Sequence, residues 1–206
     1  MSPQQRTGMS HKDRLLRQGM KHFYAYGYHG TTVDSVLAAS GVPKGSFYHH
    51  FGSKEAFGKA VLNVYMQYQL NLLQKWIDRP ELPTPDKLVG YFDEMTSEFI
   101  NSDYQRGCLA GNFSTEVSAT SESFRAQLDS DLRDWRALLV TALSDGQERG
   151  DVRKDRSAGE LADALLAMTQ GAFVIALSSR DSESLRAVST TIPLLVGTSP
   201  AAASPL

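Results

Sequence analysis

Five side chains that can donate hydrogen bonds lie within seven consecutive positions of this chain, 44–50. Ammonium, hydroxyl, phenol and imidazole groups occur there, on Lys44, Ser46, Tyr48, His49 and His50. Lysine can donate to O6 and N7 of guanine, serine can bond to any base, and phenol or imidazole groups can hold phosphates. Gly45 lies among them and leaves room for a base edge to approach the backbone. These types and this spacing suit the groove of a nucleic acid.

Two short helices joined by a tight turn are predicted to carry this cluster. Thr31 or Thr32 offers a hydroxyl N-cap to the first helix. Gly41 can adopt the left-handed conformation that a sharp turn requires, and Pro43 suits the first turn of the second helix. In a helix-turn-helix the second helix enters the major groove. The pattern therefore predicts that the cluster faces outward.

Other residues of this region are expected to fix the two helices and to hold the DNA backbone. Phe47 and Phe51, four positions apart, can pack onto the preceding helix. Thr32 at a helix N-terminus, and Lys54 beyond the second helix, are placed to meet phosphates. Such contacts would set register rather than sequence preference. A plain helical hairpin with a solvated surface is the alternative interpretation.

The distribution of charge along the chain favours the nucleic-acid interpretation. Residues 1–60 hold eight Lys and Arg against three Asp and Glu, a net charge of +5, whereas the rest of the chain carries −7. All five histidines lie within the first 50 residues. A basic segment on an acidic body is typical of a module that meets phosphates. Chance clustering is the alternative, and the helical motif weighs against it.

The N-terminal quarter resembles a known family in three segments and a short tail. These are residues 24–28 (YAYGY), 31–33 (TTV) and 39–51 (ASGVPKGSFYHHF), followed by 53–55 (SKE). Over about residues 10–65 the chain is similar to the N-terminal domain of the TetR family of bacterial transcriptional regulators. Members are homodimeric repressors, more rarely activators, that a small ligand releases from DNA operators. The resemblance implies DNA contacts at Thr32, Lys44, Gly45, Ser46, Tyr48, His49, His50 and Lys54.

An all-α fold is predicted for the whole chain, because the apolar spacing is helical and no alternating strand pattern occurs. We expect about nine helices: a helix-turn-helix DNA-binding domain at 10–55, then a ligand-sensing and dimerisation bundle at 56–196. Residues 1–9 and 197–206 are expected to be flexible tails. Pro193 is expected to bend or end the last helix near Ile192. A stripe of Phe57, Val61, Val64, Tyr68 and Leu72 is expected to be the inner face of the fourth helix.

The single cysteine, Cys108, could act as a sensor of electrophiles. Residues 106–116 (RGCLAGNFSTE), with Ser123-Phe124-Arg125, look like the subgroup of that family that responds to N-ethylmaleimide or acrylate. A thiolate adds readily to electrophilic alkenes, and it forms more easily beside a cation. Arg106 lies two residues away. A buried cysteine that acts as a small hydrophobic residue is an equally weighted alternative.

A noncovalent pocket is the competing mode of sensing, because helical bundles can build cavities between their helices. Its walls would come from aromatic residues that are individually more often core than ligand contacts. Trp135 and Asn112 are preferred because each carries a polar group on its side chain. The predicted ligand or sensor residues are Cys108, Asn112, Phe113, Trp135 and Phe173.

Residues 164–177 are apolar nearly all round, which indicates burial on more than one side. A homodimer interface with the last helix is predicted, and a deep monomer core is the alternative. The predicted interface residues are Leu165, Met168, Ala172, Ile175, Leu185, Val188 and Ile192. The stretch is judged too short and too interrupted to span a membrane, and the N-terminus carries no secretory signal, so a cytoplasmic protein is expected.

Two other function classes compete with a DNA-binding regulator. A thiol-dependent enzyme would need a base near Cys108, but every histidine lies in the basic segment and no hydrolase, zinc-protease or phosphate-loop motif occurs. An architectural protein would bind DNA without sequence preference. One cysteine excludes an internal disulfide and a multi-cysteine metal site, and no cofactor is expected. The expected partners are a double-stranded DNA operator, a small-molecule or electrophile inducer and a second copy of the chain.

Overall fold

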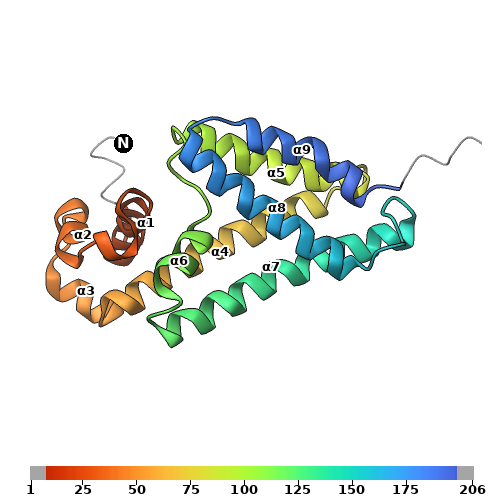
Figure 1. Cartoon of the computed structure of the whole chain (residues 1–206). Helices are drawn as coiled ribbons and strands as arrows, with labels where there is room; N and C mark the ends of the chain where they lie inside the picture. The colour runs from red at the N-terminus through yellow and green to blue at the C-terminus, as the bar shows by residue number, and fades with distance from the viewer. Residues whose placement is uncertain (1–7, 199–206) are drawn as a thin grey trace, which may run out of the picture. The chain divides into compact units, whose positions relative to one another are not determined.

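The computed structural model describes residues 8–198, and within that range every regular element is a helix (Figure 1). The only other pairing among these residues is an isolated antiparallel bridge between Val152 and Gly197. The helices are α1 (His11–Gly30), α2 (Val33–Ser40), α3 (Lys44–Phe51), α4 (Lys54–Ile77), α5 (Thr84–Asn101), α6 (Leu109–Val117), α7 (Glu122–Arg149), α8 (Ala158–Ser179) and α9 (Glu183–Val196). The all-α prediction is confirmed. The tails expected at 1–9 and 197–206 lie largely outside the described residues.

The described residues form two compact units, which we call unit 1 and unit 2. Unit 1 contains the chain up to Gln67 together with Leu109–Asp131, and unit 2 contains Tyr68–Cys108 together with the chain from Leu132 onward. Unit 1 therefore includes α6 and the beginning of α7 as well as the predicted helix-turn-helix.

Local chemistry explains where the short helices of unit 1 begin and end. The Thr32 hydroxyl accepts a hydrogen bond from the Ser35 N–H at 3.1 Å, which caps α2. Gly41 ends α2 in the left-handed conformation, with φ 63°, as expected for the turn. Ser53 caps α4 by accepting from the Ala56 N–H at 3.0 Å. Arg14 on α1 donates to the carbonyl oxygens of Ser40 and Gly41 and so ties α1 to that turn.

An aromatic core holds unit 1 together. Phe47 of α3 is fully buried and packs against Phe57 of α4, with ring centroids 5.1 Å apart. Phe23 of α1 meets Phe113 of α6 edge to face at 5.1 Å, and Phe113 meets Phe124 at 5.3 Å. Edge-to-face ring pairs add to the stability gained by burial. Through Phe57, helix α3 is thus anchored to an aromatic core that also contains rings from α1, α6 and α7.

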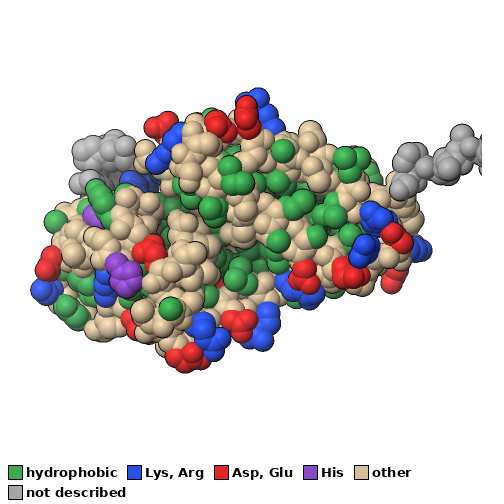
Figure 2. Space-filling view, viewed as in Figure 1, with side chains coloured by type: hydrophobic (Ala, Val, Ile, Leu, Met, Phe, Trp, Pro, Cys, Tyr) green, Lys and Arg blue, Asp and Glu red, His purple; other side chains and the backbone are tan. Residues whose placement is uncertain are grey.

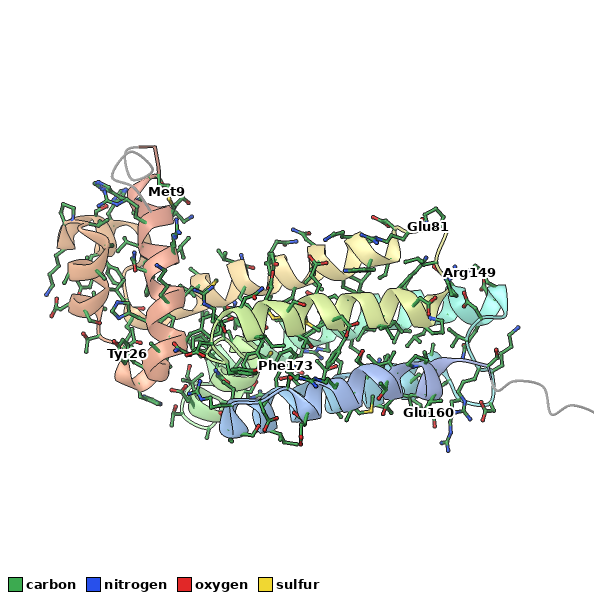
Figure 3. All side chains as sticks on the ribbon, turned by 90° about the horizontal axis from the view of Figure 1, so that it is seen from above. Met9, Tyr26, Glu81, Arg149, Glu160 and Phe173 are labelled. Atoms are coloured by element: carbon green, nitrogen blue, oxygen red, sulfur yellow. The ribbon has the colours of Figure 1, made fainter. Side chains whose placement is uncertain are left out.

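Unit 2 is a bundle in which α5, α8 and α9 pack against one another. Its buried side chains include Leu88, Phe92 and Phe99 of α5 and Phe173 of α8. Phe173 contacts both α5 phenylalanines, with centroids 6.0 Å and 5.4 Å apart, and Figure 3 labels it among the side chains between these helices. A capping box at Ser157 starts α8.

α8 (Ala158–Ser179) is longer than the apolar stretch of residues 164–177 that the sequence analysis considered. It has 22 residues, and an 18-residue window within it has a mean hydropathy of 1.6, so among the described residues it is the one helix long and apolar enough to cross a bilayer, judged by length and composition. The expectation that the stretch is too short was therefore wrong. Its packing on α9 and α5 is what the core helix of a globular protein also shows.

Two finer expectations were wrong in part. Phe57, Val61 and Leu72 of the expected α4 stripe are buried. Val64 and Tyr68 are 43% and 44% exposed, because the buried side of this helix also runs through Leu62, Tyr65 and Met66. Pro193 does not end α9 at Ile192, since the helix continues to Val196. A proline so near the end removes few internal hydrogen bonds.

Candidate DNA-reading surface and ligand cavity

The outer side of α3 exposes the side chains that the sequence singled out. Lys44, Gly45, His49 and His50 are exposed, and Tyr48 is 48% exposed. Nothing lies within 4 Å of the position that a Cβ would take at Gly45. The backbone of α3 is therefore open to a flat partner at its first turn.

Neighbouring groups hold two of these side chains loosely. Lys44 Nζ lies 3.2 Å from Asp34 Oδ1 of α2, and both side chains are mostly exposed. Such a pair contributes little stability and is easily exchanged for a phosphate or a base. The Ser46 hydroxyl, which is half-buried, lies 3.2 Å from His11 Nδ1 of α1.

Lys54 is less available than predicted. Its Nζ lies 4.6 Å from the centroid of the Tyr28 ring and 3.5 Å from the His29 carbonyl oxygen. Burial lowers the pKa of Lys54, and the Glu116 carboxylate opposes that shift. In this structure its ammonium stabilises the end of α1. A phosphate contact would require it to leave the Tyr28 ring.

Glu116 of α6 is a structural residue that the sequence did not reveal. Its carboxylate accepts hydrogen bonds from the backbone N–H of Tyr28 at 2.7 Å and of His29 at 3.3 Å. The helix breaks just before these groups, at Gly27, where φ is 67°. The broken turn leaves two N–H groups without helical partners, and the carboxylate takes them.

A small cavity lies inside unit 2 among α5, α7, α8 and α9. Its walls include Tyr91, Met95, Trp135, Leu166 and Thr169, and its volume is about 20 Å³. A cavity of this size has room for about one water molecule.

Cys108 is buried in the same unit, with 6% of its surface exposed. The side-chain amide of Gln170, on α8 next to Thr169 of the cavity wall, donates a hydrogen bond to its sulfur at 3.2 Å. Arg106, proposed as the neighbouring cation, is exposed.

Tyr91 lies beside both Cys108 and Trp135. Burial raises the pKa of Tyr91 well above its usual range, the neighbouring Cys108 adds to the rise, and a weak hydrogen-bonding contact from the Trp135 indole opposes it. The phenol is therefore held neutral, and it donates a hydrogen bond to Gln69 Oε1 at 3.2 Å. Trp135 meets Tyr91 edge to face at 6.5 Å, but its buried Nε1 makes no hydrogen bond of acceptable geometry.

The five predicted sensor residues do not all lie in one place. Cys108, Trp135 and Phe173 belong to unit 2, whereas Asn112 and Phe113 belong to unit 1. Phe113 is fully buried among the rings of Phe23 and Phe124, so its role there is packing. Asn112 is half-buried, and its backbone carbonyl oxygen accepts a hydrogen bond from the Thr115 hydroxyl.

The predicted dimer residues divide in a similar way. Leu165, Ala172, Leu185 and Ile192 are buried in the core of unit 2 and offer no surface to a second chain. Met168 and Val188 are half-buried. Ile175 is 57% exposed, and two residues that the prediction omitted, Val174 and Leu194, are 58% and 77% exposed. Figure 2 shows hydrophobic side chains reaching the surface along α8.

Comparison with known proteins decides the family. The chain matches the description "Bacterial regulatory proteins, tetR family" over residues 15–61 and "Tetracyclin repressor-like, C-terminal domain" over residues 84–192. The chain belongs to the TetR family. Its members are transcriptional regulators with a helix-turn-helix and not enzymes, so the resemblance found in the sequence is confirmed.

Individual TetR-family relatives agree in sequence and in fold. The transcriptional repressor DhaR of Mycobacterium sp. (strain GP1) is 35% identical, over 84% of this chain and 86% of that protein. The transcriptional regulator AcuR of Cereibacter sphaeroides is 34% identical, over 78% of this chain and 73% of that protein. The crystal structure of the reduced form of Escherichia coli NemR has a TM-score of 0.85 at 31% identity, covering 93% of this chain and 98% of that one.

Proposed function

We propose that this TetR-family chain is a cytoplasmic, homodimeric repressor. It binds a palindromic DNA operator through α3, and reaction of Cys108 with an electrophile releases it. The exposed side of α3 over a ring-packed core supports the DNA contact. The relatives DhaR and NemR are repressors by name.

The Cys108–Gln170 hydrogen bond is the observation on which the sensing proposal depends. It places the side-chain amide of Gln170, which follows the cavity residue Thr169 in sequence, on the sulfur of the only cysteine. That NemR has been solved in a form described as reduced fits a relative in which thiol chemistry matters. Addition of an electrophile to a thiol needs no second cysteine, which fits a chain whose sequence contains one.

The chain offers a short covalent route from the sensor to the DNA-reading unit. Cys108 directly precedes α6, and α6 carries Glu116, which binds the backbone at the end of α1. Two recognition helices must lie about 34–36 Å apart to engage both half-sites. An adduct that fits a state with another spacing better than the DNA-bound state would release the operator.

Binding of selected genomic duplexes, measured by fluorescence anisotropy with and without N-ethylmaleimide, tests this proposal. The wild-type protein should bind without the reagent and lose the duplex with it. The Cys108→Ser variant should bind as tightly and keep the duplex in the presence of the reagent. Release of that variant by the reagent would refute the thiol sensor, and equal affinity for a random duplex would refute sequence-selective repression.

A further inference from the structure

We infer that His11 is a positioning residue that determines base specificity, because it sets whether the Ser46 hydroxyl donates to a DNA base or accepts from one. This role goes beyond the proposed function and rests on its contact between α3 and the operator. It starts from one pair of side chains, since His11 Nδ1 lies 3.2 Å from the Ser46 hydroxyl oxygen across 35 positions of sequence. Both residues belong to unit 1.

The start of α1 is fixed against α3 by two attachments. The Ser10 hydroxyl caps α1 by accepting from the Asp13 N–H at 3.1 Å, so the helix begins at His11 in a defined geometry. One turn further along, Arg14 donates to two carbonyl oxygens of the turn that precedes α3. The fold itself therefore brings His11 and Ser46 together.

The orientation of the Ser46 hydroxyl depends on His11. The side chain is half-buried, and among the described residues its hydroxyl makes no other hydrogen bond. A serine within a helix can instead bond to a carbonyl of the preceding turn, which would fix its proton there. A hydroxyl has one proton to donate, so a proton directed at His11 is not available to DNA.

Protonation of His11 reverses the direction of this hydrogen bond. A neutral imidazole in water carries its proton mostly on Nε2 and accepts at Nδ1, so the Ser46 O–H points to the ring and its lone pairs are left for DNA. An imidazolium donates at Nδ1, so the oxygen accepts and the O–H is left for DNA. Lone pairs bind the amino groups of cytosine or adenine, whereas the O–H binds O6 or N7 of guanine. One proton on α1 thus changes the base that α3 prefers.

Other charged and titratable groups surround this pair in the first turn of α1, in α2 and in α3. They are Lys12, Asp13, Arg14, Asp34, Lys44, Tyr48, His49 and His50. Asp13 accepts from the Ser10 hydroxyl at 2.7 Å, and Lys44 lies against Asp34. The α6 contacts described above, from Phe113 to Phe23 and from Glu116 to Tyr28, lie toward the other end of α1. His49 and His50 are exposed, so their protonation should strengthen binding to every duplex and leave base preference unchanged.

The test measures base preference of the intact protein at two pH values by fluorescence anisotropy. Selection from a randomised duplex pool gives the operator, and the position at which Ser46→Ala loses preference is the one that Ser46 reads. The preference is the affinity with guanine at that position divided by the affinity with cytosine. Histidine changes charge between about pH 5 and pH 8. From the upper to the lower end of that range, the ratio should rise roughly threefold to tenfold, which is the worth of one hydrogen bond.

Two histidine variants of α1 identify the group that takes up the proton. His11→Gln retains a hydrogen-bonding side chain that does not titrate, so its ratio should be the same at both pH values. His22→Gln is the matched control, because His22 Nδ1 lies 3.4 Å from the Ser35 hydroxyl of α2 in a similar pair. It should keep the wild-type rise. A constant ratio in the wild-type protein, or a rise that persists in His11→Gln, would overturn the inference.

Nitrogen-15 resonances of the histidine rings test the hydrogen bond without DNA. At high pH the His11 Nδ1 resonance should be that of an unprotonated acceptor, and it should move in Ser46→Ala while that of His22 stays in place. An Nδ1 that carries the proton at high pH, or that ignores the Ser46 substitution, would overturn the inference even where DNA binding is selective. If the resonances behave as expected but no duplex is preferred over a random one, the proposed repressor function fails, and the base-reading role of His11 fails with it.

Discussion

The Glu116 carboxylate binds the Tyr28 backbone N–H at 2.7 Å across 88 positions of sequence. This bond joins α6 to the junction between α1 and α2, within unit 1. Because a carboxylate acceptor strengthens a hydrogen bond, it is a main stabilising contact of a helix end that Gly27 has broken.

Replacing Glu116 with glutamine should destabilise unit 1 and weaken binding to DNA. The amide is a weaker acceptor for the Tyr28 and His29 N–H groups, so we expect a loss of about 1–2 kcal/mol in the free energy of unfolding. Thermal denaturation and anisotropy with operator DNA measure the two effects. Glu122→Gln, at an exposed position in the first turn of α7 where the carboxylate pairs only with Arg125, is the control and should change stability by no more than a surface ion pair does and leave DNA binding unchanged. A Glu116 variant as stable as its parent would contradict the assigned role.

Alanine at two glycines should separate folding from DNA contact. At Gly27 φ is positive, and an added Cβ would lie 2.7 Å from Glu116 Oε2, so Gly27→Ala should cost about 1–3 kcal/mol of stability. At Gly45, within α3, an added Cβ meets nothing within 4 Å, so the melting temperature should stay the same or rise slightly while DNA affinity falls. Calorimetry measures the stability of the two variants, and fluorescence anisotropy measures their affinity for DNA. Unchanged DNA affinity of Gly45→Ala would show that DNA does not approach the start of α3.

Two substitutions on α3 should affect DNA binding in different ways. Lys44→Ala removes a donor for base edges and should relax base preference at one position, by about 1–3 kcal/mol. Tyr48→Phe removes a phosphate contact and should weaken binding to all duplexes alike, by about 0.5–1.5 kcal/mol. Selection from a randomised duplex pool followed by anisotropy distinguishes them. Unaltered base preference in the Lys44 variant would disprove its assignment.

The exposed stripe on α8 and α9 should hold two copies together. Ile175→Glu places a charge next to the exposed Val174, and it should convert the proposed dimer into a monomer. Val64→Glu alters an exposed valine of α4 and is the control. Sedimentation equilibrium gives the mass. If both variants keep the mass of the wild-type protein, the dimer uses a different surface.

Glu94 should make stability fall in acid. The hydrogen bond from Lys75 lowers the pKa of Glu94, burial opposes the shift, and the Trp76 indole adds to it. A lowered pKa in the folded state means that its contribution is present above the unfolded value and is lost as pH falls through the folded one. Melting temperatures measured from about pH 6 to pH 3 should therefore drop less steeply for Glu94→Gln than for wild type. The corresponding difference in the free energy of unfolding should be under about 1 kcal/mol. Glu81→Gln, at an exposed position, should follow the wild-type curve.

Sequence alone predicted the features that depend on local chemistry. The cap at Thr32 and the left-handed Gly41 both follow from residues within a few positions of each other. The Glu116 bond could not be predicted, because its partners are backbone groups 87 and 88 positions away. They are available only because Gly27 breaks the helix.

The surface of α8 shows a second limit of sequence reasoning. The apolar composition of a helix indicates that most of its faces are shielded from water. It does not indicate which face packs against the rest of the same chain. The prediction therefore placed Leu165 and Ala172 at an interface, whereas they fill the core, and it missed Val174. Likewise Cys108 and Phe113, five positions apart in one motif, lie in different units.

The exposure of Val174 and Ile175 on α8 also makes the amount of paired protein depend on how much of the chain a cell synthesises. A chain that must pair to cover such side chains exists as separate copies when it is scarce, and in that regime the number of pairs follows the square of the number of chains. Halving expression would then lower the paired form about fourfold. Cells with this protein would pass between silenced and active transcription over a narrow range of synthesis rates.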